Sequence, residues 1–152
     1  MSEFVCDRQV FLDMPTCPKA QVLEFLAAKA VELGISADGE AVLAAFEARE
    51  AEGATGMVDG FAVPHAKSAA IDRASVIVIR FAGDIADWET IDDTKVNLAI
   101  ALLVPDAEAG TTHLTLLTQL ARALMDDDFR SGIRSAVEPA EVAGLINARL
   151  EA

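Results

Sequence analysis

The chain contains two histidines, and His65 has the more informative surroundings. It follows Val63 and Pro64, and the proline ring fixes its own φ while it favours an extended conformation at the residue before it. The imidazole is therefore expected at the end of a short strand, on the connecting segment that follows. With an ordinary pKa of about 6.5 the ring is mostly neutral at pH 7, so one nitrogen can attack an electrophile while the other is held by a hydrogen bond. His65 is a candidate nucleophile.

The second histidine, His113, stands at the start of a segment with strong helical periodicity. If Thr112 is the N-cap, its hydroxyl and the free backbone N–H groups of the first turn favour an anion such as a dianionic phosphoryl group. A second imidazole across such a site would orient the attacking histidine or donate a hydrogen bond to phosphoryl oxygens. Arg49, near the end of another predicted helix, would add a planar cation that is always charged.

Each of these residues also has an ordinary structural explanation. A histidine on a loop is more often a satisfied or solvent-exposed polar residue than a nucleophile, and His113 would be tolerated at a helix start without any role. Arg49 lies between acidic residues and would pair locally on a helix surface, while Lys67 would be a solvated loop cation. The residues alone leave both interpretations open.

Other catalytic classes lack their signatures in this sequence. It has no H-E-x-x-H zinc motif, no phosphate-binding P-loop, no G-x-G-x-x-G and no G-x-S-x-G nucleophile elbow. Two histidines would bind a metal only with carboxylates that their spacing does not identify. Cys6 and Cys17 are too few for a redox motif or a zinc site and are predicted to be free thiols. Histidine chemistry without a cofactor remains.

Composition predicts one domain over residues 1–152. The apolar fraction is 53%, and 25 acidic against 12 basic residues give a formal charge of −13. Such a charge repels phosphate backbones, so nucleic acid is a poor partner. The longest strongly apolar stretch, residues 98–104, is far below the roughly 18 residues needed to span a membrane, and no signal peptide is visible. The protein is therefore expected to be cytoplasmic, without direct membrane insertion.

Hydrophobic periodicity divides the chain into strands and helices. Strands are predicted at residues 9–12, 61–63, 75–81 and 96–104, and helices at residues 19–33, 38–51, from 112 onward, 127–135 and 139–150. The continuous apolarity of residues 96–104 is typical of a strand that is covered on both faces. The order β-α-α-β-β-β-α-α-α favours an α/β fold in which a sheet lies between helical layers.

Four segments, in this order and spacing, make the chain similar to a known family over nearly its whole length. They are Arg49-Glu50 with Thr55-Gly56; Asp59-Gly60-Phe61-Ala62-Val63-Pro64-His65-Ala66-Lys67-Ser68; Ile85-Ala86-Asp87-Trp88 with Val96-Asn97-Leu98; and His113-Leu114-Thr115-Leu116-Leu117 running to Leu124-Met125-Asp126-Asp127-Asp128-Phe129-Arg130. Together they resemble the enzyme IIA domain of the fructose/mannitol class (type 2) of the bacterial phosphoenolpyruvate-dependent sugar phosphotransferase system. The resemblance implies a three-layer α/β/α sandwich with a mixed central sheet.

The resemblance also implies roles for the candidate residues, with no cofactor. His65 would accept a phosphoryl group from the phosphorylated carrier protein HPr and pass it to a cysteine of an enzyme IIB domain. His113 would assist without being phosphorylated, and Arg49 would position the group. The residues predicted to bind the phosphoryl group are Thr112, Ala66 and Lys67. Enzyme IIB and the membrane component IIC are absent from this chain, so a free-standing subunit is expected.

Three functions are compatible with this resemblance. The first is uptake of fructose or a related sugar or polyol, because Asp87-Trp88 and residues 57–61 look closer to the sugar-specific branch. The alternative is a nitrogen-related regulatory enzyme IIA, which uses the same histidine and binds other proteins according to its phosphorylation state. A binding module that has lost phosphotransfer is disfavoured because both histidines and Arg49 are retained. The chain departs from the family pattern at residues 91–95, where the loss of a glycine is expected to alter the loop.

Overall fold

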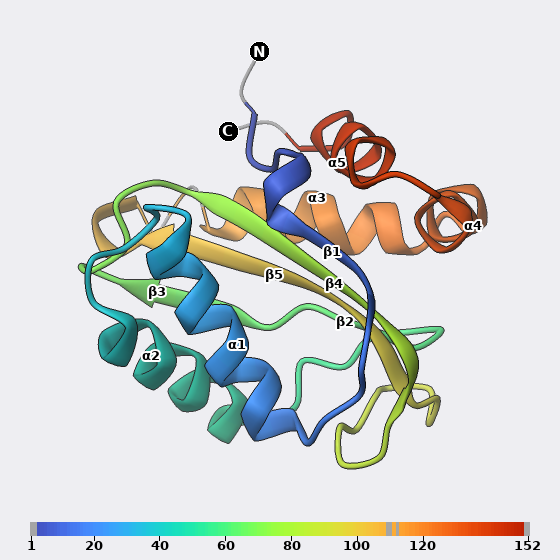
Figure 1. The fold of residues 1–152 in the computed structure, drawn as a ribbon, viewed down its shortest axis with the longest axis horizontal. Coiled ribbons are helices and arrows are strands. Elements are labelled where there is room, and N and C mark those ends of the chain that lie inside the picture. Colours follow the sequence, from blue (N-terminus) through green and yellow to red (C-terminus); the bar gives the residue numbers. More distant parts are fainter. Residues whose placement is uncertain (1–2, 109–110, 112, 151–152) are drawn as a thin grey trace.

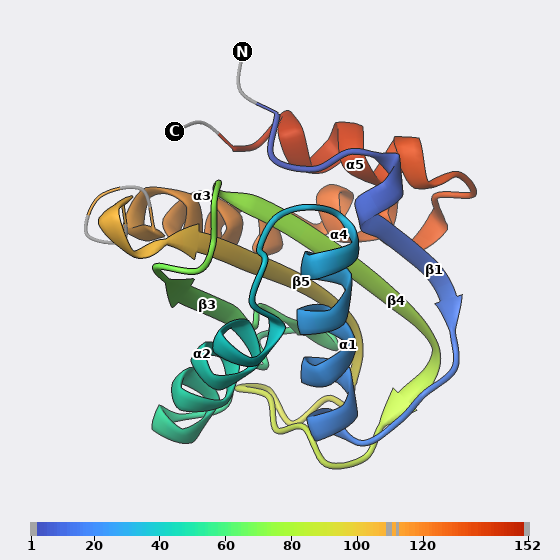
Figure 2. The same ribbon diagram turned by 60° about the vertical axis from the view of Figure 1, so that its left-hand side comes forward.

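The structure is a computed structural model in which residues 3–108, 111 and 113–150 are described. In chain order the elements are η1 (Asp7–Gln9), β1 (Val10–Met14), α1 (Lys19–Glu32), α2 (Gly39–Glu52), β2 (Phe61–Ala62), β3 (His65–Ser68), β4 (Ser75–Ile85), β5 (Val96–Pro105), η2 (Asp106–Glu108), α3 (Leu114–Leu124), α4 (Asp127–Ser135) and α5 (Pro139–Asn147). Helices α1 and α2 lie on one side of the sheet, and α3, α4 and α5 lie on the other (Figure 1, Figure 2). The three layers confirm the predicted α/β/α sandwich.

The central sheet is mixed, as the resemblance implied. Its strands run in the order β1-β4-β5-β2, and β3 also pairs with β5. β4 and β5 are antiparallel, whereas β1 is parallel to β4, and both β2 and β3 are parallel to β5. One strand, β5, therefore lies beside every strand of the sheet except β1.

Strand β5 has both faces buried. Leu98 and Ile100 belong to the core beneath α3, α4 and α5, while Ala99 and Ala101 belong to the core beneath α1 and α2. Successive side chains of a strand point to opposite faces of a sheet, which produces this division. The nearly continuous apolar sequence of β5 is thus explained by two covered faces, as predicted.

The segment around His65 differs from the prediction of a strand end followed by a connecting segment. It forms two short strands, and His65 is the first residue of β3. The pairs Phe61↔Leu98 and His65↔Leu102 have the same offset, so β2 and β3 follow β5 without a change of register. Pro64 lacks a backbone N–H and interrupts the strand, yet its carbonyl accepts from the Leu102 N–H at 2.9 Å. The described part of the chain therefore has four strands, not three, between α2 and α3.

The helices agree well with the periodicity in the sequence. The bounds of α4 match the prediction, whereas α5 ends at Asn147, three residues before the predicted end at 150. Helix α2 begins after Asp38, whose side chain accepts from the Ala41 N–H at 3.1 Å and so caps the first turn. Within residues 3–108, 111 and 113–150, no helix is long and apolar enough to cross a membrane.

The loop between β4 and β5 contains residues 91–95, where this chain is expected to lack a glycine of the family pattern. Asp93 in this loop has a φ of +62°, in the left-handed region that glycine favours. Aspartate tolerates this region better than most residues because its short side chain can form local hydrogen bonds. The loop therefore makes a left-handed turn with an aspartate.

Candidate functional site

His65 is held at both of its ring nitrogens. The residue is 5% exposed at the first position of β3. Its Nδ1 atom lies 2.9 Å from the Val63 carbonyl oxygen, and its Nε2 atom accepts a hydrogen bond from Arg49 Nε at 2.9 Å. A carbonyl only accepts and a guanidinium only donates, so Nδ1 carries the hydrogen while Nε2 keeps its lone pair. The surroundings thus leave Nε2 as the basic atom of the ring.

Arg49 reaches His65 from the last turn of α2. In addition to its bond to the imidazole, its Nη1 atom donates to the Gly53 carbonyl at 2.8 Å, at the point where the helix ends. These two bonds fix the direction of the guanidinium. Local pairing along the helix surface, which was the ordinary explanation for Arg49, is therefore not its arrangement.

His113 lies directly before α3 and faces His65 across the site. The two ring centroids are 4.9 Å apart with an angle of 40° between the ring planes. His113 is 8% exposed, and its Nε2 atom is buried without a hydrogen-bond partner among the residues that the structure describes. A buried polar atom without a partner is uncommon in folded proteins and points to a ligand or another polar group at that place. His113 is therefore suited to contact a group bound between the two rings.

A cavity of about 260 Å³ lies between these side chains. Its lining residues are Ala45, Ala48, Arg49, Glu52, His65, Lys67 and His113. Arg49 and Lys67 carry positive charges and Glu52 carries a negative one. The cavity therefore has a net positive charge and favours a small anion. Its polar and charged side chains come from α2, from β3 and from the residue before α3, which are far apart in the sequence.

Both histidines are shifted toward the neutral form. Burial lowers the pKa of His65 below its ordinary value; the hydrogen bond to Val63 opposes this shift, and the Arg49 cation adds to it. Burial also lowers the pKa of His113, to about 4, and the neighbouring positive charges act in the same direction. At pH 7 each ring therefore has a lone pair available, and neither adds a charge to the cavity.

The structure brings His65, His113, Arg49 and Lys67 together at one cavity, whereas the side chain of Ala66 points away from it. Ala66 is 1% exposed and its side chain packs in the core beneath α1 and α2, because neighbouring residues of a strand face opposite sides. Thr112, the predicted N-cap, lies outside the described residues. Of the two described residues that were predicted to bind a phosphoryl group, Lys67 lines the cavity and Ala66 does not.

Glu50 and Thr55, which are hydrogen-bonded to each other, received no individual role from the sequence. Glu50 belongs to a charge run that suggests solvent exposure, but its side chain is only 6% exposed and pairs with Lys19 at 3.0 Å. Its carboxylate also accepts from the backbone N–H of Thr55 at 3.2 Å and from the Thr55 hydroxyl. No local pattern identifies these partners, because Lys19 belongs to another helix. The one available signal was the segment Arg49-Glu50 with Thr55-Gly56, which carries part of the family resemblance.

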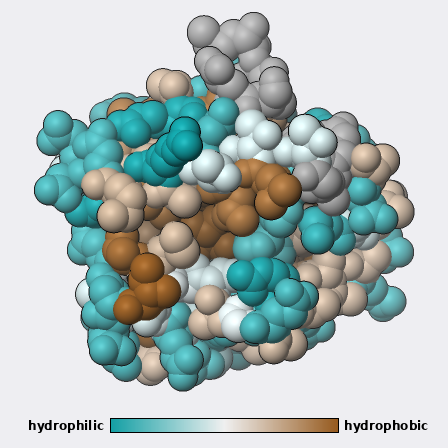
Figure 3. Space-filling model, turned by 180° about the vertical axis from the view of Figure 1, so that it is seen from behind, coloured by the Kyte–Doolittle hydropathy of each residue, from teal (hydrophilic) through white to brown (hydrophobic). Residues whose placement is uncertain are grey.

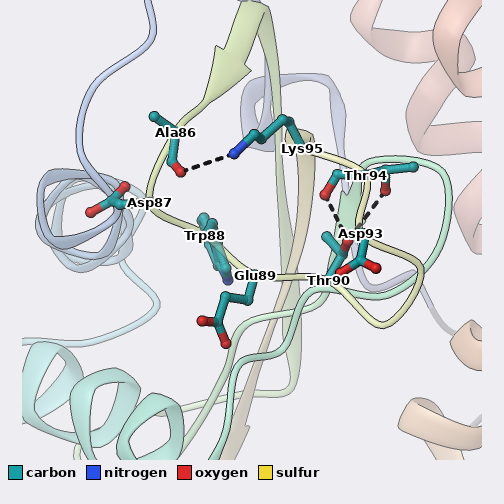
Figure 4. Close-up of a pocket in the computed structure, with 8 residues that line it drawn as sticks. All are labelled: Ala86, Asp87, Trp88, Glu89, Thr90, Asp93, Thr94 and Lys95. Carbon is teal, nitrogen blue, oxygen red and sulfur yellow. Dashed lines mark hydrogen bonds between the residues drawn. The ribbon is translucent and has the colours of Figure 1, made fainter.

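A larger cavity, of about 730 Å³, lies against the loop between β4 and β5 (Figure 4). It is lined by Ala86, Asp87, Trp88, Glu89, Thr90, Asp93, Thr94 and Lys95. The loop is held partly by its own polar groups, since Lys95 Nζ lies 3.5 Å from the Ala86 carbonyl and the Thr90 hydroxyl donates to the Thr94 carbonyl at 2.6 Å. Neither histidine lines this cavity, so the smaller one is the candidate site.

A bound metal ion has no ready set of ligands in the described residues. Within them, no group of three or more His, Cys, Asp or Glu side chains is placed to hold a metal ion. The site's chemistry is that of a buried, neutral imidazole with an oriented lone pair, faced by a second imidazole and by two basic side chains. Such an arrangement can receive and release a small dianion at one nitrogen.

Comparison with known proteins identifies relatives that cover most of the chain. A fructose-specific EIIA component of Haloferax volcanii is 37% identical over 127 residues, which are 84% of this chain and 81% of that protein. A 2-O-α-mannosyl-D-glycerate-specific EIIABC component of Escherichia coli is 35% identical over 130 residues, which are 85% of this chain but only 20% of that protein. The chain thus spans about a fifth of the second relative and most of the first.

The fold has a similarly clear counterpart among solved structures. The nitrogen regulatory protein IIA-Ntr from Neisseria meningitidis superimposes with a TM-score of 0.85 at 26% sequence identity, over 94% of this chain and 96% of that one. Residues 3–149 also match the family model described as "Phosphoenolpyruvate-dependent sugar phosphotransferase system, EIIA 2". The chain therefore belongs to the EIIA 2 family of the phosphoenolpyruvate-dependent sugar phosphotransferase system, and it is a phosphotransferase.

Proposed function

We propose that this chain is a phosphocarrier of sugar uptake, in which Nε2 of His65 accepts a phosphoryl group from phosphorylated HPr and passes it to a cysteine of an enzyme IIB. The observation that carries the proposal is the pair of facing histidines. One has an oriented lone pair on Nε2, and the other has a buried Nε2 without a partner among the described residues. A phosphoryl group on the first would lie next to the second.

The bonds formed and broken in the phosphoryl transfer can be accounted for without a cofactor. The Nε2 lone pair of His65 attacks the phosphorus atom, the new N–P bond forms, and the bond from phosphorus to the donor group of HPr breaks and returns its electron pair to that donor. The Nδ1 hydrogen stays directed at the Val63 carbonyl, which stabilises the positive charge that the ring gains during the attack. Transfer to enzyme IIB repeats these events with a thiolate as the attacking group.

The basic side chains would hold the dianionic group. Arg49 Nε donates to Nε2 of His65 in the free protein. Once the Nε2 lone pair has formed the bond to phosphorus, we expect the guanidinium group to donate to the phosphoryl oxygens instead. Lys67 would contribute a second positive charge, and His113 would contact an oxygen through Nε2. Thr112 remains a predicted donor at the start of α3.

The surface suits partners that dock and leave. Seen from behind relative to Figure 1, the molecule has a hollow lined by hydrophobic side chains and bordered by hydrophilic ones (Figure 3). Leu114, the residue after His113, is 61% exposed. A modest apolar contact with a polar border is typical of transient protein interfaces.

Sugar uptake is preferred to nitrogen regulation because relatives at 35% and 37% identity carry the names of sugar-specific components. The E. coli relative also joins EIIA to further EII components in its name, which supports an enzyme IIB as the acceptor. The regulatory alternative is kept because of the close structural similarity to the Neisseria nitrogen regulatory protein. Fructose or a related sugar or polyol is the proposed substrate class of the complete system.

The proposal is tested by incubating the protein with phosphoenolpyruvate, enzyme I and HPr and measuring its mass. We expect the mass of one phosphoryl group to be added in an acid-labile form and to be absent in His65→Ala. Folding of that variant is checked by the fluorescence of the single tryptophan. A mass gain that survives His65→Ala would show that the nucleophile is a different residue.

A second step separates the two functions. Addition of a fructose-type enzyme IIB should remove the phosphoryl group from His65 and place it on the enzyme IIB cysteine. Retention of the group in the presence of sugar-type enzyme IIB proteins would instead favour the regulatory alternative.

A further inference from the structure

We propose that Glu50 is a positioning residue of the phosphoryl-transfer site, which acts through Thr55 and the backbone of Val63 on the imidazole of His65. The kinetic part of this inference rests on the proposed function, whereas the structural part concerns the free protein. Glu50 itself does not contact His65 by a hydrogen bond in the described structure, so its effect is indirect.

The Glu50 carboxylate is buried and receives donors from two parts of the chain. Oε2 lies 3.0 Å from Lys19 Nζ, at the start of α1, and 3.2 Å from the Thr55 backbone nitrogen, which donates to it. Oε1 accepts from the Thr55 hydroxyl. A carboxylate with only 6% of its side chain exposed is costly unless such donors satisfy it, so these contacts are stronger constraints than a surface ion pair.

Thr55 passes this constraint to the nucleophile. Its carbonyl accepts from the Val63 N–H at 3.0 Å, and the Val63 carbonyl is the group that holds Nδ1 of His65 at 2.9 Å. The hydrogen bonds therefore run from Glu50 through Thr55 and Val63 to His65. A shift of the Thr55 segment would move the acceptor that sets the tautomer and direction of the ring.

The neighbouring residue holds the other side of the same ring. Arg49 donates to Nε2 of His65, and its second bond is to Gly53, which lies between Glu50 and Thr55 in the sequence. The turn that follows α2 is thus the common support of both partners of the imidazole. Anchoring this turn is the specific contribution of the buried carboxylate.

Lys19 connects the same carboxylate to the only tryptophan of the chain. Its ammonium group lies 5.6 Å from the centroid of the Trp88 ring while it pairs with Glu50. Loss of the Glu50 charge would free the ammonium group to move relative to the indole. Trp88 fluorescence is therefore a spectroscopic report on this network.

The charge of Glu50 also acts on His65 in the direction opposite to the surrounding cations. The charged groups around the ring are Arg49 and Glu50 from α2, Lys67 from β3 and Glu52 at the cavity wall, with His113 opposite. Burial lowers the pKa of His65, whereas the Glu50 carboxylate raises it. Removal of this charge should lower the pKa further and make Nε2 less basic.

The first experiment compares Glu50→Gln with Glu47→Gln, which removes the same charge from an exposed position of the same helix. The imidazole protons of the free protein are titrated by NMR, without any phosphoryl donor. We expect a lower His65 pKa and an altered Trp88 emission in Glu50→Gln, and wild-type values in Glu47→Gln. An unchanged His65 titration in folded Glu50→Gln would overturn the proposal, even if that variant were less stable.

The second experiment uses the hydroxyl of Thr55. Thr55→Val keeps the size of the side chain but removes the hydroxyl that donates to Glu50 Oε1, while the backbone N–H can still donate to Oε2. Thr55→Ser restores the hydroxyl donor. Phosphorylation by phospho-HPr should be slower in Thr55→Val, on the order of tenfold, since small displacements of a reacting group are costly, and Thr55→Ser should recover most of the rate. Equal rates in Thr55→Val and Thr55→Ser would contradict the proposed path. Failure of the wild type to become phosphorylated would instead refute the proposed function, while the titration result would stand.

Discussion

The two sides of the site differ in how completely their histidines are held. On the side of α2 and β3, both ring nitrogens of His65 have partners, and a buried carboxylate supports the turn behind them. On the side of α3, Nε2 of His113 has no partner in the described part of the chain. One imidazole is fixed before any ligand arrives, whereas the other keeps a nitrogen available for it.

This difference suggests how work is divided between the two residues. A nucleophile gains from a fixed direction, because the loss of rotational freedom then precedes the reaction. A residue that stabilises the transferred group gains from an atom that becomes satisfied only when the group is present. The prepared side should therefore be more sensitive to mutation than the open side.

The largest effect is expected from Arg49→Gln, which breaks the prepared side. It removes the charged donor to His65 Nε2 and one of the two cations that line the cavity. The rate of phosphorylation by phospho-HPr, measured by rapid quench, should fall about 10²–10³-fold, as for loss of one preorganised donor. Arg49→Lys keeps the positive charge but loses the planar guanidinium group, so its phosphorylation rate should lie between those of the wild type and Arg49→Gln. A rate for Arg49→Gln near that of the wild type would remove this residue from the site.

A smaller effect is expected from His113→Ala, which tests the open side. His65 keeps both of its partners, so phosphorylation should persist but be slower, by up to about a hundredfold, and transfer to enzyme IIB should suffer as well. His113→Gln provides an amide in roughly the place of Nε2 and should recover part of the rate. If His113→Ala behaves as the wild type in both half-reactions, the open side has no role in transfer.

The smallest effect is expected in the pH dependence of stability, because the histidines on both sides of the site are held in the neutral form. The folded pKa of each histidine is depressed, to about 4 for His113, while the unfolded value is about 6.5. The unfolded chain therefore binds more protons below pH 6.5, and the free energy of unfolding should decrease as the pH falls from about 6.5 toward 4. This decrease can be measured by thermal melting between about pH 7 and about pH 5. Most carboxylates stay ionised over this range, so their titration contributes little.

His113→Gln is the control for the pH effect. Because it removes one of the two depressed groups, its melting temperature should depend less on pH over the same interval. Parallel curves for the wild type and this variant would show that His113 is not held neutral by the fold.

The sequence was sufficient for the layers of the fold, because helical and strand periodicity are local. The continuous apolarity of β5 and the apolar faces of the helices predicted a covered sheet, and the structure confirms it. The segment after Pro64 was predicted wrongly as a connection, since a proline normally breaks a strand. Strand β3 forms because β5 is long enough to pair with the chain on both sides of the interruption, and that pairing is not local.

Within the candidate site, the sequence indicated residue types but not their supports. His65, His113, Arg49 and Lys67 do meet at one cavity. The buried state of Glu50 was missed because its partners, Lys19 and Thr55, depend on how two helices and a turn pack together. Charge patterns describe exposed helices well, and they fail where a tertiary contact covers one member of the run.

The segment at residues 55–57 has a consequence beyond the site. Strand β2 is at the end of the sheet, and this segment lies antiparallel along its outer edge. The Val63 N–H donates to the Thr55 carbonyl, and the Met57 N–H donates to the Phe61 carbonyl at 2.7 Å. An uncovered edge strand is a template for pairing with another molecule. The contacts that support the nucleophile thus also occupy an edge of the sheet that would otherwise be open to pairing with another molecule.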